Sequence, residues 1–211
     1  MSRPDGQLTS LRGETGDASN VLLLAPSMGE EGDEGCSRLL TVEPEESKDV
    51  LSITLTESPD DRLAVWRRHA SGRPARTGFV NVGDPTRSVS ADSGGSIELP
   101  GRDMTIETVS SPADLTGIGI KVSSFLSEWA EDGNSIVVCF HSLTTLLQYI
   151  DLQEAFRFLH VLTGRLEAVD AVAHYHMDPD AHDEREVNTL KALFDAVVEV
   201  DGDGEWTVRT R

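Results

Sequence analysis

The sequence of 211 residues predicts an α/β fold built on a mainly parallel β-sheet. Short, continuous apolar runs at residues 21–25 and 136–140 are typical of strands buried on both faces of a sheet. Between such runs apolar residues recur at helical spacing, as they do over residues 118–129. Strands that alternate with helices of this length favour parallel pairing through right-handed crossovers.

In the first half of the chain, the sequence predicts a tail, four strands and two helices. Residues 1–19 are almost devoid of apolar side chains, so we expect a disordered tail followed by a single domain over residues 20–211. Ser58 and Pro59 are suited to the N-cap and first position of a helix. Strands are expected at residues 21–25, 50–56, 78–82 and 104–109, a weak helix at 36–41, a stronger one at 58–70, and a mobile surface loop at 87–102.

In the second half, three helices alternate with the remaining strands. Phe156 and Phe194 occupy apolar positions of two helices and should be buried, whereas Phe79 should be less well covered. An Asp-Gly-Asp-Gly turn separates the two terminal strands. Helices are expected at residues 118–129, 152–164 and 187–197, and strands at 135–141, 168–176, 197–200 and 206–209.

The composition is strongly acidic, with 18 basic and 37 acidic residues and a formal net charge of −19. Such a surface repels phosphate backbones and the sequence has no basic stripe, so we expect no binding to nucleic acid. Lysine-poor, acidic proteins resemble those of salt-accumulating archaea, in which salt screens the repulsion. With neither a signal segment nor a membrane-length apolar run, we expect a cytoplasmic protein without membrane insertion and with two reduced thiols, Cys36 and Cys139.

Three segments carry a resemblance to known proteins: Cys139-Phe-His-Ser-Leu-Thr144, residues 156–164, and His174-Tyr-His-Met-Asp-Pro179. In these segments and in the order of its elements, the chain resembles the RecA/KaiC-like ATPase superfamily, and within it an uncharacterised haloarchaeal family. The resemblance implies a three-layer sandwich in which helices flank a mainly parallel sheet on both faces. It also implies that Glu57, after the second strand, lies where a water-activating base would be, although an acid at the start of a helix is the simpler interpretation.

The residues that ATP chemistry requires are missing. A phosphate loop needs a glycine-rich turn with a lysine and a Ser/Thr, but the first lysine of this chain is Lys48. Arg38 could offer a single cation, although a solvated arginine at a helix is the simpler interpretation. His141 stands where the superfamily has the acid that organises Mg²⁺. The expected phosphate turn, residues 28–35, instead carries four acids: Glu30, Glu31, Asp33 and Glu34.

Ligands of open α/β sheets bind beyond the carboxyl ends of the strands. We therefore expect a candidate crevice there, with no catalytic residue, metal or cofactor. His141 could be structural, could contact a ligand, or could pair with Cys139 as a nucleophile, although alternate strand positions lie about 6.8 Å apart. The candidate ligand-binding residues are Glu57, His141, Ser142, His176 and Asp178.

The sequence leaves two functions open. The first is a non-catalytic RecA/KaiC-like domain that binds a protein partner or self-associates in signalling or regulation. The second is a metal-dependent enzyme or ligand sensor that uses His141 with a cluster of His174, His176 and His182. Alternation places His174 and His176 on one strand face, an arrangement that metal sites favour, but helix caps at Asp178 and Asp183 are the simpler interpretation of this segment.

Overall fold

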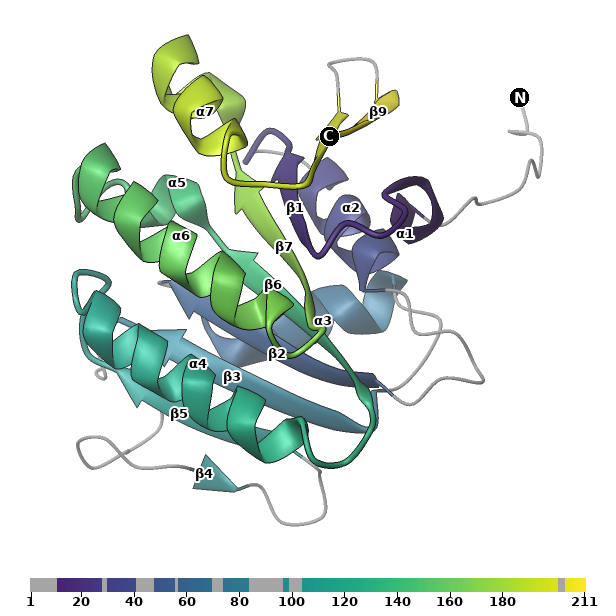
Figure 1. Ribbon diagram of the computed structural model, residues 1–211, viewed down its shortest axis with the longest axis vertical. Helices are drawn as coiled ribbons and strands as arrows, with labels where there is room; N and C mark the ends of the chain where they lie inside the picture. Colours follow the sequence, from purple (N-terminus) through teal and green to yellow (C-terminus); the bar gives the residue numbers. More distant parts are fainter. Residues whose placement is uncertain are drawn as a thin grey trace.

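Nine strands form one sheet in the order β4-β5-β3-β2-β6-β7-β1-β8-β9 (Figure 1). The computed structural model describes residues 11–27, 30–40, 48–55, 57–69, 74–83, 97–98, 104–200 and 204–211. Among these strands, only the β4–β5 and β8–β9 pairs are antiparallel. The strands are β1 (Asn20–Leu24), β2 (Lys48–Leu55), β3 (Arg76–Val82), β4 (Ile97–Glu98), β5 (Met104–Val109), β6 (Ser135–His141), β7 (Val172–Met177), β8 (Ala196–Val200) and β9 (Trp206–Thr210).

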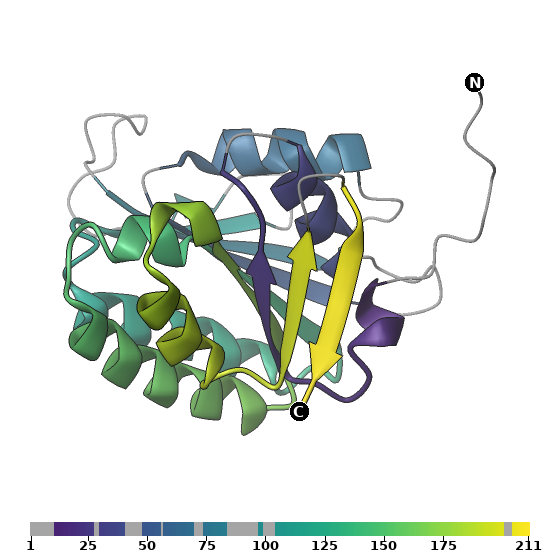
Figure 2. The ribbon, with the colours of Figure 1, turned by 90° about the horizontal axis from the view of Figure 1, so that it is seen from above.

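Helices cover both faces of this sheet, as the view from above shows (Figure 2). The face with α2 (Glu31–Leu39) and α3 (Pro59–His69) also carries the short α1 (Leu11–Glu14). The opposite face carries α4 (Leu115–Trp129) and α6 (Leu152–Glu167). The remaining helices are α5 (Leu143–Leu146), a 3₁₀ turn (Pro179–Ala181) and α7 (Glu184–Lys191). The expected fold class is confirmed: a mainly parallel sheet within three layers, consistent with a RecA-like α/β fold.

The alternation of strand side chains divides the core between the two faces. The larger cluster lies under α4 and α6 and includes Leu22, Phe140 and Tyr175. The next residues along the same strands point the other way: Cys139 packs with Trp66 and other residues of the α2–α3 face. Strands β1 and β6 are therefore buried on both faces, which explains their continuous apolar sequences.

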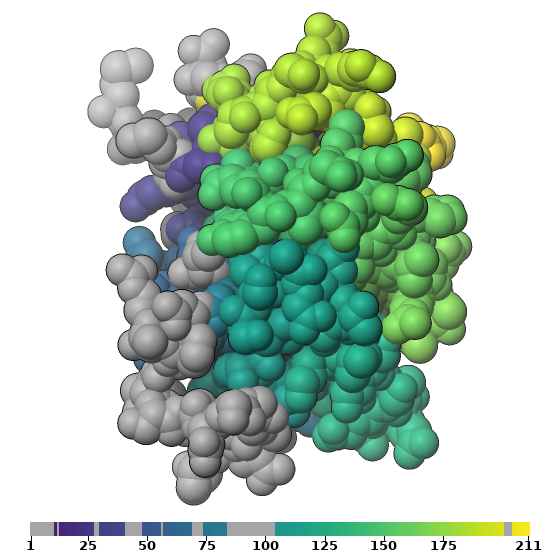
Figure 3. Space-filling model, turned by 90° about the vertical axis from the view of Figure 1, so that its left-hand side faces the viewer, coloured from purple at the N-terminus to yellow at the C-terminus, as the bar shows by residue number. Residues whose placement is uncertain are grey.

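The carboxyl ends of β2, β3 and β5 lie at the left of Figure 1. Figure 3 views the molecule from that side, where the surfaces of α4, α6 and α7 adjoin one another. The helix starts follow the sequence signals: Ser58 Oγ accepts the Asp61 amide at 3.2 Å, and Asp183 forms a capping box with Glu186. Among the described helices, none combines the length and the apolar character needed to cross a membrane.

The structure differs from the sequence expectations at several points. Residues 11–19, expected in a disordered tail, include α1, and Leu11 is buried against β1 and β8 residues. Residues 1–10 lie outside the described residues, as does the loop expected at 87–102 except for β4. The strand expected from residue 168 begins at Val172, because α6 continues to Glu167.

The three phenylalanine predictions fare differently. Phe194 is buried as expected, but it follows α7, which ends at Lys191. Phe156 is only half-buried, because α6 turns it toward the edge of its apolar face. Phe79, expected to be less covered, is fully buried beneath Trp66, with ring centroids 5.7 Å apart. The face covered by α2 and α3 is thus a full core layer.

Candidate functional site

The parallel strands β1, β2, β6 and β7 end around a cavity of about 310 Å³. Loop and strand-end residues bring five predicted side chains to its wall. Glu57 follows β2, His141 and Ser142 stand at the end of β6, and His176 and Asp178 stand at the end of β7. All five candidate residues therefore line one cavity, and their binding of a ligand stays a prediction.

Two of these residues accept hydrogen bonds from nearby backbone amides. Ser142 is the N-cap of α5, where its Oγ accepts the Thr145 amide at 3.2 Å. Asp178 caps the 3₁₀ turn and also accepts the Ser27 amide at 2.8 Å. Partial burial acts to raise the pKa of Asp178, but its hydrogen bonds from Ser27 and Asp180 outweigh burial and lower it. Asp178 thus ties the end of β7 to the loop that follows β1.

Burial makes the two histidines of the cavity harder to protonate, because it lowers the pKa of each. Burial holds the pKa of His141 well below its ordinary value, and the proximity of His176 and Arg62 lowers it further. Burial likewise lowers the pKa of His176, whose ring centroid lies 4.6 Å from that of His141. Burial raises the pKa of Glu57, whose Oε2 lies 3.5 Å from His141 Nδ1. The wall therefore offers two imidazoles of lowered pKa beside a carboxyl group of raised pKa.

The acids expected in the phosphate turn belong mainly to the first turn of α2, which begins at Glu31. Met28 and Gly29 of that turn lie outside the described residues. Asp33 lines the cavity and accepts a hydrogen bond from Arg62 at 3.0 Å, while Glu34 pairs with Arg38. Arg38 lies over the Trp206 ring, 5.5 Å from its centroid. Within the described part of the chain, neither lysine nor arginine lines the cavity.

His182 does not join the other two histidines of the alternative metal set. Its Nε2 lies 3.2 Å from Thr144 Oγ1 and its Nδ1 lies 3.4 Å from Glu186 Oε2. These contacts attach the loop before α7 to α5. The helix-cap interpretation of this segment holds for Asp178 and Asp183, each of which caps the element that follows it.

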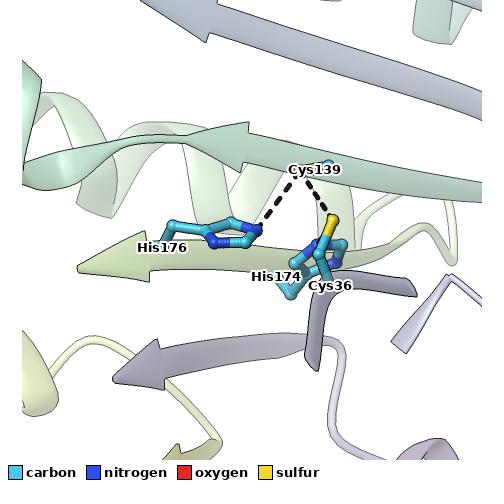
Figure 4. A group of neighbouring side chains, drawn as sticks. All are labelled: Cys36, Cys139, His174 and His176. Atoms are coloured by element: carbon cyan, nitrogen blue, oxygen red, sulfur yellow. Dashed lines mark hydrogen bonds between the residues drawn. The ribbon is translucent and has the colours of Figure 1, made fainter. Parts of the chain in front are cut away.

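Sequence reasoning missed a group of four buried side chains next to the cavity. We call Cys36 of α2, Cys139 of β6, and His174 and His176 of β7 the Cys/His cluster (Figure 4). Their donor atoms all lie within 4.8 Å of one another. His176 belongs to both features, because it also lines the cavity. Cys139 Sγ lies 3.6 Å from His176 Nε2, so Cys139 pairs with His176 and the alternative of a Cys139–His141 pair gains no support.

Strand register explains three members of the cluster. Cys139 is directly opposite His174 in the parallel β6–β7 ladder, and His176 is two residues further along the same face. The alternation in the sequence signalled that His174 and His176 share a face. It could not show that β6 and β7 are neighbours, or that α2 places Cys36 above them.

A buried arginine borders the cluster. Arg62 of α3 is 1% exposed and donates to the Cys36 sulfur at 3.1 Å, while its other amino group approaches Asp33. Burial opposes its charge, but the neighbouring cysteines and carboxylates outweigh burial and raise its pKa. Burial also acts to raise the pKa of the Cys36 thiol. The hydrogen bond from Cys139 and the proximity of His174 and Arg62 overcome that effect and lower it well below its usual range.

Comparison with known proteins identifies a fold and a family. The chain is similar to the solved structure described as a structural study of Project ID PH0250 from Pyrococcus horikoshii OT3. The TM-score is 0.55 at 9% identity, over 92% of this chain and 86% of that chain, so the likeness concerns the fold alone. No curated protein matches the sequence. The family of unknown function DUF7504 matches residues 18–200, and the chain therefore belongs to that family.

Proposed function

We propose that this chain is a RecA/KaiC-like domain without ATPase chemistry that acts in regulation by binding a protein partner or a second copy of itself. The observation that carries the non-catalytic part is the charge of the cavity. Asp33, Glu57 and Asp178 line it, and among the described residues no lysine or arginine does. A nucleoside triphosphate needs positive charge at this place.

The surrounding contacts support the same conclusion. The Ser27 amide, in the loop where a phosphate would be held, already binds the Asp178 carboxylate. Arg62 is directed to Asp33 and the Cys36 sulfur. Two like charges about 4 Å apart repel by about 1 kcal/mol in water and about 4 kcal/mol at the effective dielectric constant of a protein surface. With Arg62 already engaged by Asp33, and Asp178 holding the Ser27 amide, the cavity offers a triphosphate no free cation among its described lining residues.

Calorimetric titration with Mg-ATP in molar KCl tests the loss of nucleotide binding. We expect no heat of binding for the wild type and no ATP turnover for His141→Asp. That variant restores an acid at the end of β6 but leaves the acidic α2 start unchanged. Micromolar binding by the wild type, or turnover by the variant, would contradict the proposal.

The partner-binding part needs a separate measurement. In RecA-type assemblies the domains associate side by side, so an interface can outlast the loss of nucleotide chemistry. Light scattering coupled to size exclusion, over a range of protein concentrations in molar KCl, reports self-association. Co-purification from the native cell reports a hetero-partner. A chain that stays monomeric and is recovered alone would argue against this function.

The proposed setting is the cytoplasm of a halophilic archaeon, because of the net charge of −19. The Debye length falls from about 10 Å at 0.1 M salt to about 3 Å at 1 M salt, so concentrated salt screens carboxylate repulsion. We predict cooperative folding above about 1 M KCl and partial unfolding near 0.1 M. Circular dichroism melts across this range measure it, and a melting temperature independent of salt would reject the halophilic setting.

A second candidate is a metal-dependent enzyme or ligand sensor at the same cavity. His176 favours it, because this residue lines the cavity and also belongs to the Cys/His cluster. His141 is the other imidazole on the wall. An NMR titration with small anions and metabolites tests this candidate. Chemical shifts of the His141 and His176 imidazoles that change and reach a plateau would support a sensor. Unchanged chemical shifts would leave only the protein-binding role.

A further inference from the structure

The Cys/His cluster has the donors of a tetrahedral metal centre. Two thiol sulfurs and two imidazole nitrogens converge from three elements, and each of the four side chains is at most 5% exposed. The cluster lies on the α2–α3 side of the sheet, where its neighbours include Val50, Phe79 and Val137. Buried polar groups need partners, and thiols are weak hydrogen-bond donors and acceptors.

The distances fit one ion in the middle. A tetrahedral Zn²⁺ with bonds of about 2.3 Å to sulfur and about 2.0–2.1 Å to nitrogen separates its donors by about 3.3–3.8 Å. The two sulfurs are 3.6 Å apart, Cys139 Sγ and His176 Nε2 are 3.6 Å apart, and Cys36 Sγ and His174 Nε2 are 3.3 Å apart. Figure 4 shows the contacts of Cys139 with His176 and with Cys36 as dashed lines. These three donor pairs thus stand at coordination spacing, and all four donor atoms lie within 4.8 Å of one another.

The chemistry of the donor set selects the metal. Two thiolates with two neutral imidazoles favour Zn²⁺ over the hard cations Mg²⁺ and Ca²⁺, which take oxygen ligands. Two thiolates also balance the charge of a divalent ion, which reduces the cost of burying it. With four protein donors and almost no exposure, the centre has no open position and suits a structural role.

Arg62 completes the surroundings of the centre. Its NH2 group donates to the Cys36 sulfur at 3.1 Å, a hydrogen bond that orients a thiolate ligand. Asp33 at 3.0 Å and Glu57 at 3.7 Å balance the guanidinium charge. The Arg62 guanidinium therefore adds no uncompensated positive charge next to the metal ion.

We propose that Cys36, Cys139, His174 and His176 bind one Zn²⁺ ion in a closed tetrahedral site that fastens α2 to strands β6 and β7. The proposal is independent of the proposed protein-binding function, because it concerns a metal that holds the fold together. A disulfide between Cys36 and Cys139 is the competing chemistry. It requires a two-electron oxidant and the loss of two protons, and it gives no reason for two imidazole nitrogens to converge on the same point.

The test uses the full chain, produced without an affinity tag and handled with a reductant in molar KCl. After loosely held metal is removed on a chelating resin, we expect one equivalent of zinc per chain by elemental analysis. Replacement by Co²⁺ should give the intense visible absorption of a tetrahedral ion and the near-ultraviolet sulfur-to-cobalt charge-transfer band. The wild-type spectrum decides the matter even if variants fail to fold.

Single substitutions then identify the ligands. Cys36→Ser and His174→Ala should each weaken zinc binding by at least about 100-fold, since loss of an outer-shell partner alone costs 10–100-fold. The matched controls are His160→Ala, at an exposed position of α6, and His182→Ala, in the alternative set. Both should bind as the wild type does.

Three results would overturn the proposal. One is a reduced wild-type chain that gives no charge-transfer band with Co²⁺. Another is a native mass two hydrogens lower under the same reducing conditions, which would identify a Cys36–Cys139 disulfide. The third is loss of the cobalt spectrum in His182→Ala with its retention in His174→Ala, which would place the metal elsewhere.

Discussion

The two faces of the β6–β7 ladder are equally buried but carry different kinds of side chain. On one face Phe140 lies against Tyr175, its partner in the strand register, with ring centroids 5.8 Å apart. On the other face the preceding pair, Cys139 and His174, is equally buried but polar. Backbone pairing, register and exposure are the same for both pairs, so the side-chain chemistry alone distinguishes them.

The comparison shows where packing is sufficient and where it is not. The aromatic face needs only dispersion and one hydrogen bond, from Tyr175 Oη to Asn20 Oδ1 at 3.1 Å. The Cys/His face lacks such complementary partners in the described chain beyond its own members and Arg62. Its stability should therefore depend on what the cluster binds, whereas that of the aromatic face should not.

The largest expected effect belongs to the aromatic face. Phe140→Ala should lower the free energy of unfolding by about 3–5 kcal/mol, with or without zinc, because it empties a well-packed site. Cys139→Ala in zinc-free protein should cost only about 1 kcal/mol, as for an average substitution. Urea denaturation at fixed KCl measures both, and equal losses would remove the distinction between the faces.

Zinc should stabilise the other face by a similar amount. At a free concentration of about 1,000 times its Kd, the ion should raise the free energy of unfolding by about 4 kcal/mol. Phe140→Ala should keep this gain and Cys139→Ala should lose it. Urea melts with and without added zinc provide the measurement, and a gain that survives in Cys139→Ala would show that zinc acts elsewhere.

Arg62→Met tests the edge of the cluster. We expect a loss of about 2 kcal/mol, less than for a fully buried ion pair, because Asp33 and Glu57 keep partial contact with water. Zinc affinity should fall by about 10-fold through the lost hydrogen bond to Cys36. Arg67→Met, at an exposed position of the same helix, is the control and should change neither quantity.

The smallest effect concerns Glu57. Because burial raises its pKa, the folded state holds this proton more tightly than the unfolded state does. Stability should therefore fall as pH rises from the ordinary carboxyl pKa through the raised value. Glu57→Gln should flatten that part of the profile and gain less than about 1 kcal/mol at neutral pH, since the group is partly solvated. Exposed Glu128→Gln should keep the wild-type slope.

The periodicity of the sequence was enough for the sheet and its flanking helices. Doubly buried strands such as β1 have continuous apolar sequences, and this signal is local. The burial of Phe156 and Phe79 could not be predicted from this signal. For Phe156 it depends on how α6 is rotated about its axis, and for Phe79 on which helix covers β3. Packing of α3 over β3, which brings Trp66 onto Phe79, is a tertiary fact.

The candidate site divides in the same way. The cavity residues could be predicted because each stands at the end of a parallel strand, and all such ends meet at one edge. The Cys/His cluster could not, because its members come from residues 36, 139, 174 and 176 and meet only through the strand order. The sequence around Cys36 does not indicate which strands this face of α2 packs against.

The position of β1 has a consequence for synthesis on the ribosome. This first strand is paired on both sides, by β7 and by β8, so its first neighbour is complete only at Met177 and its second at Val200. Until then residues 21–24 have no strand to pair with and their apolar side chains stay uncovered, while β2, β3 and β5 can already associate. Such distant pairing slows folding and exposes the nascent chain to aggregation. Synthesis of β7 and β8 thus completes the pairing of β1.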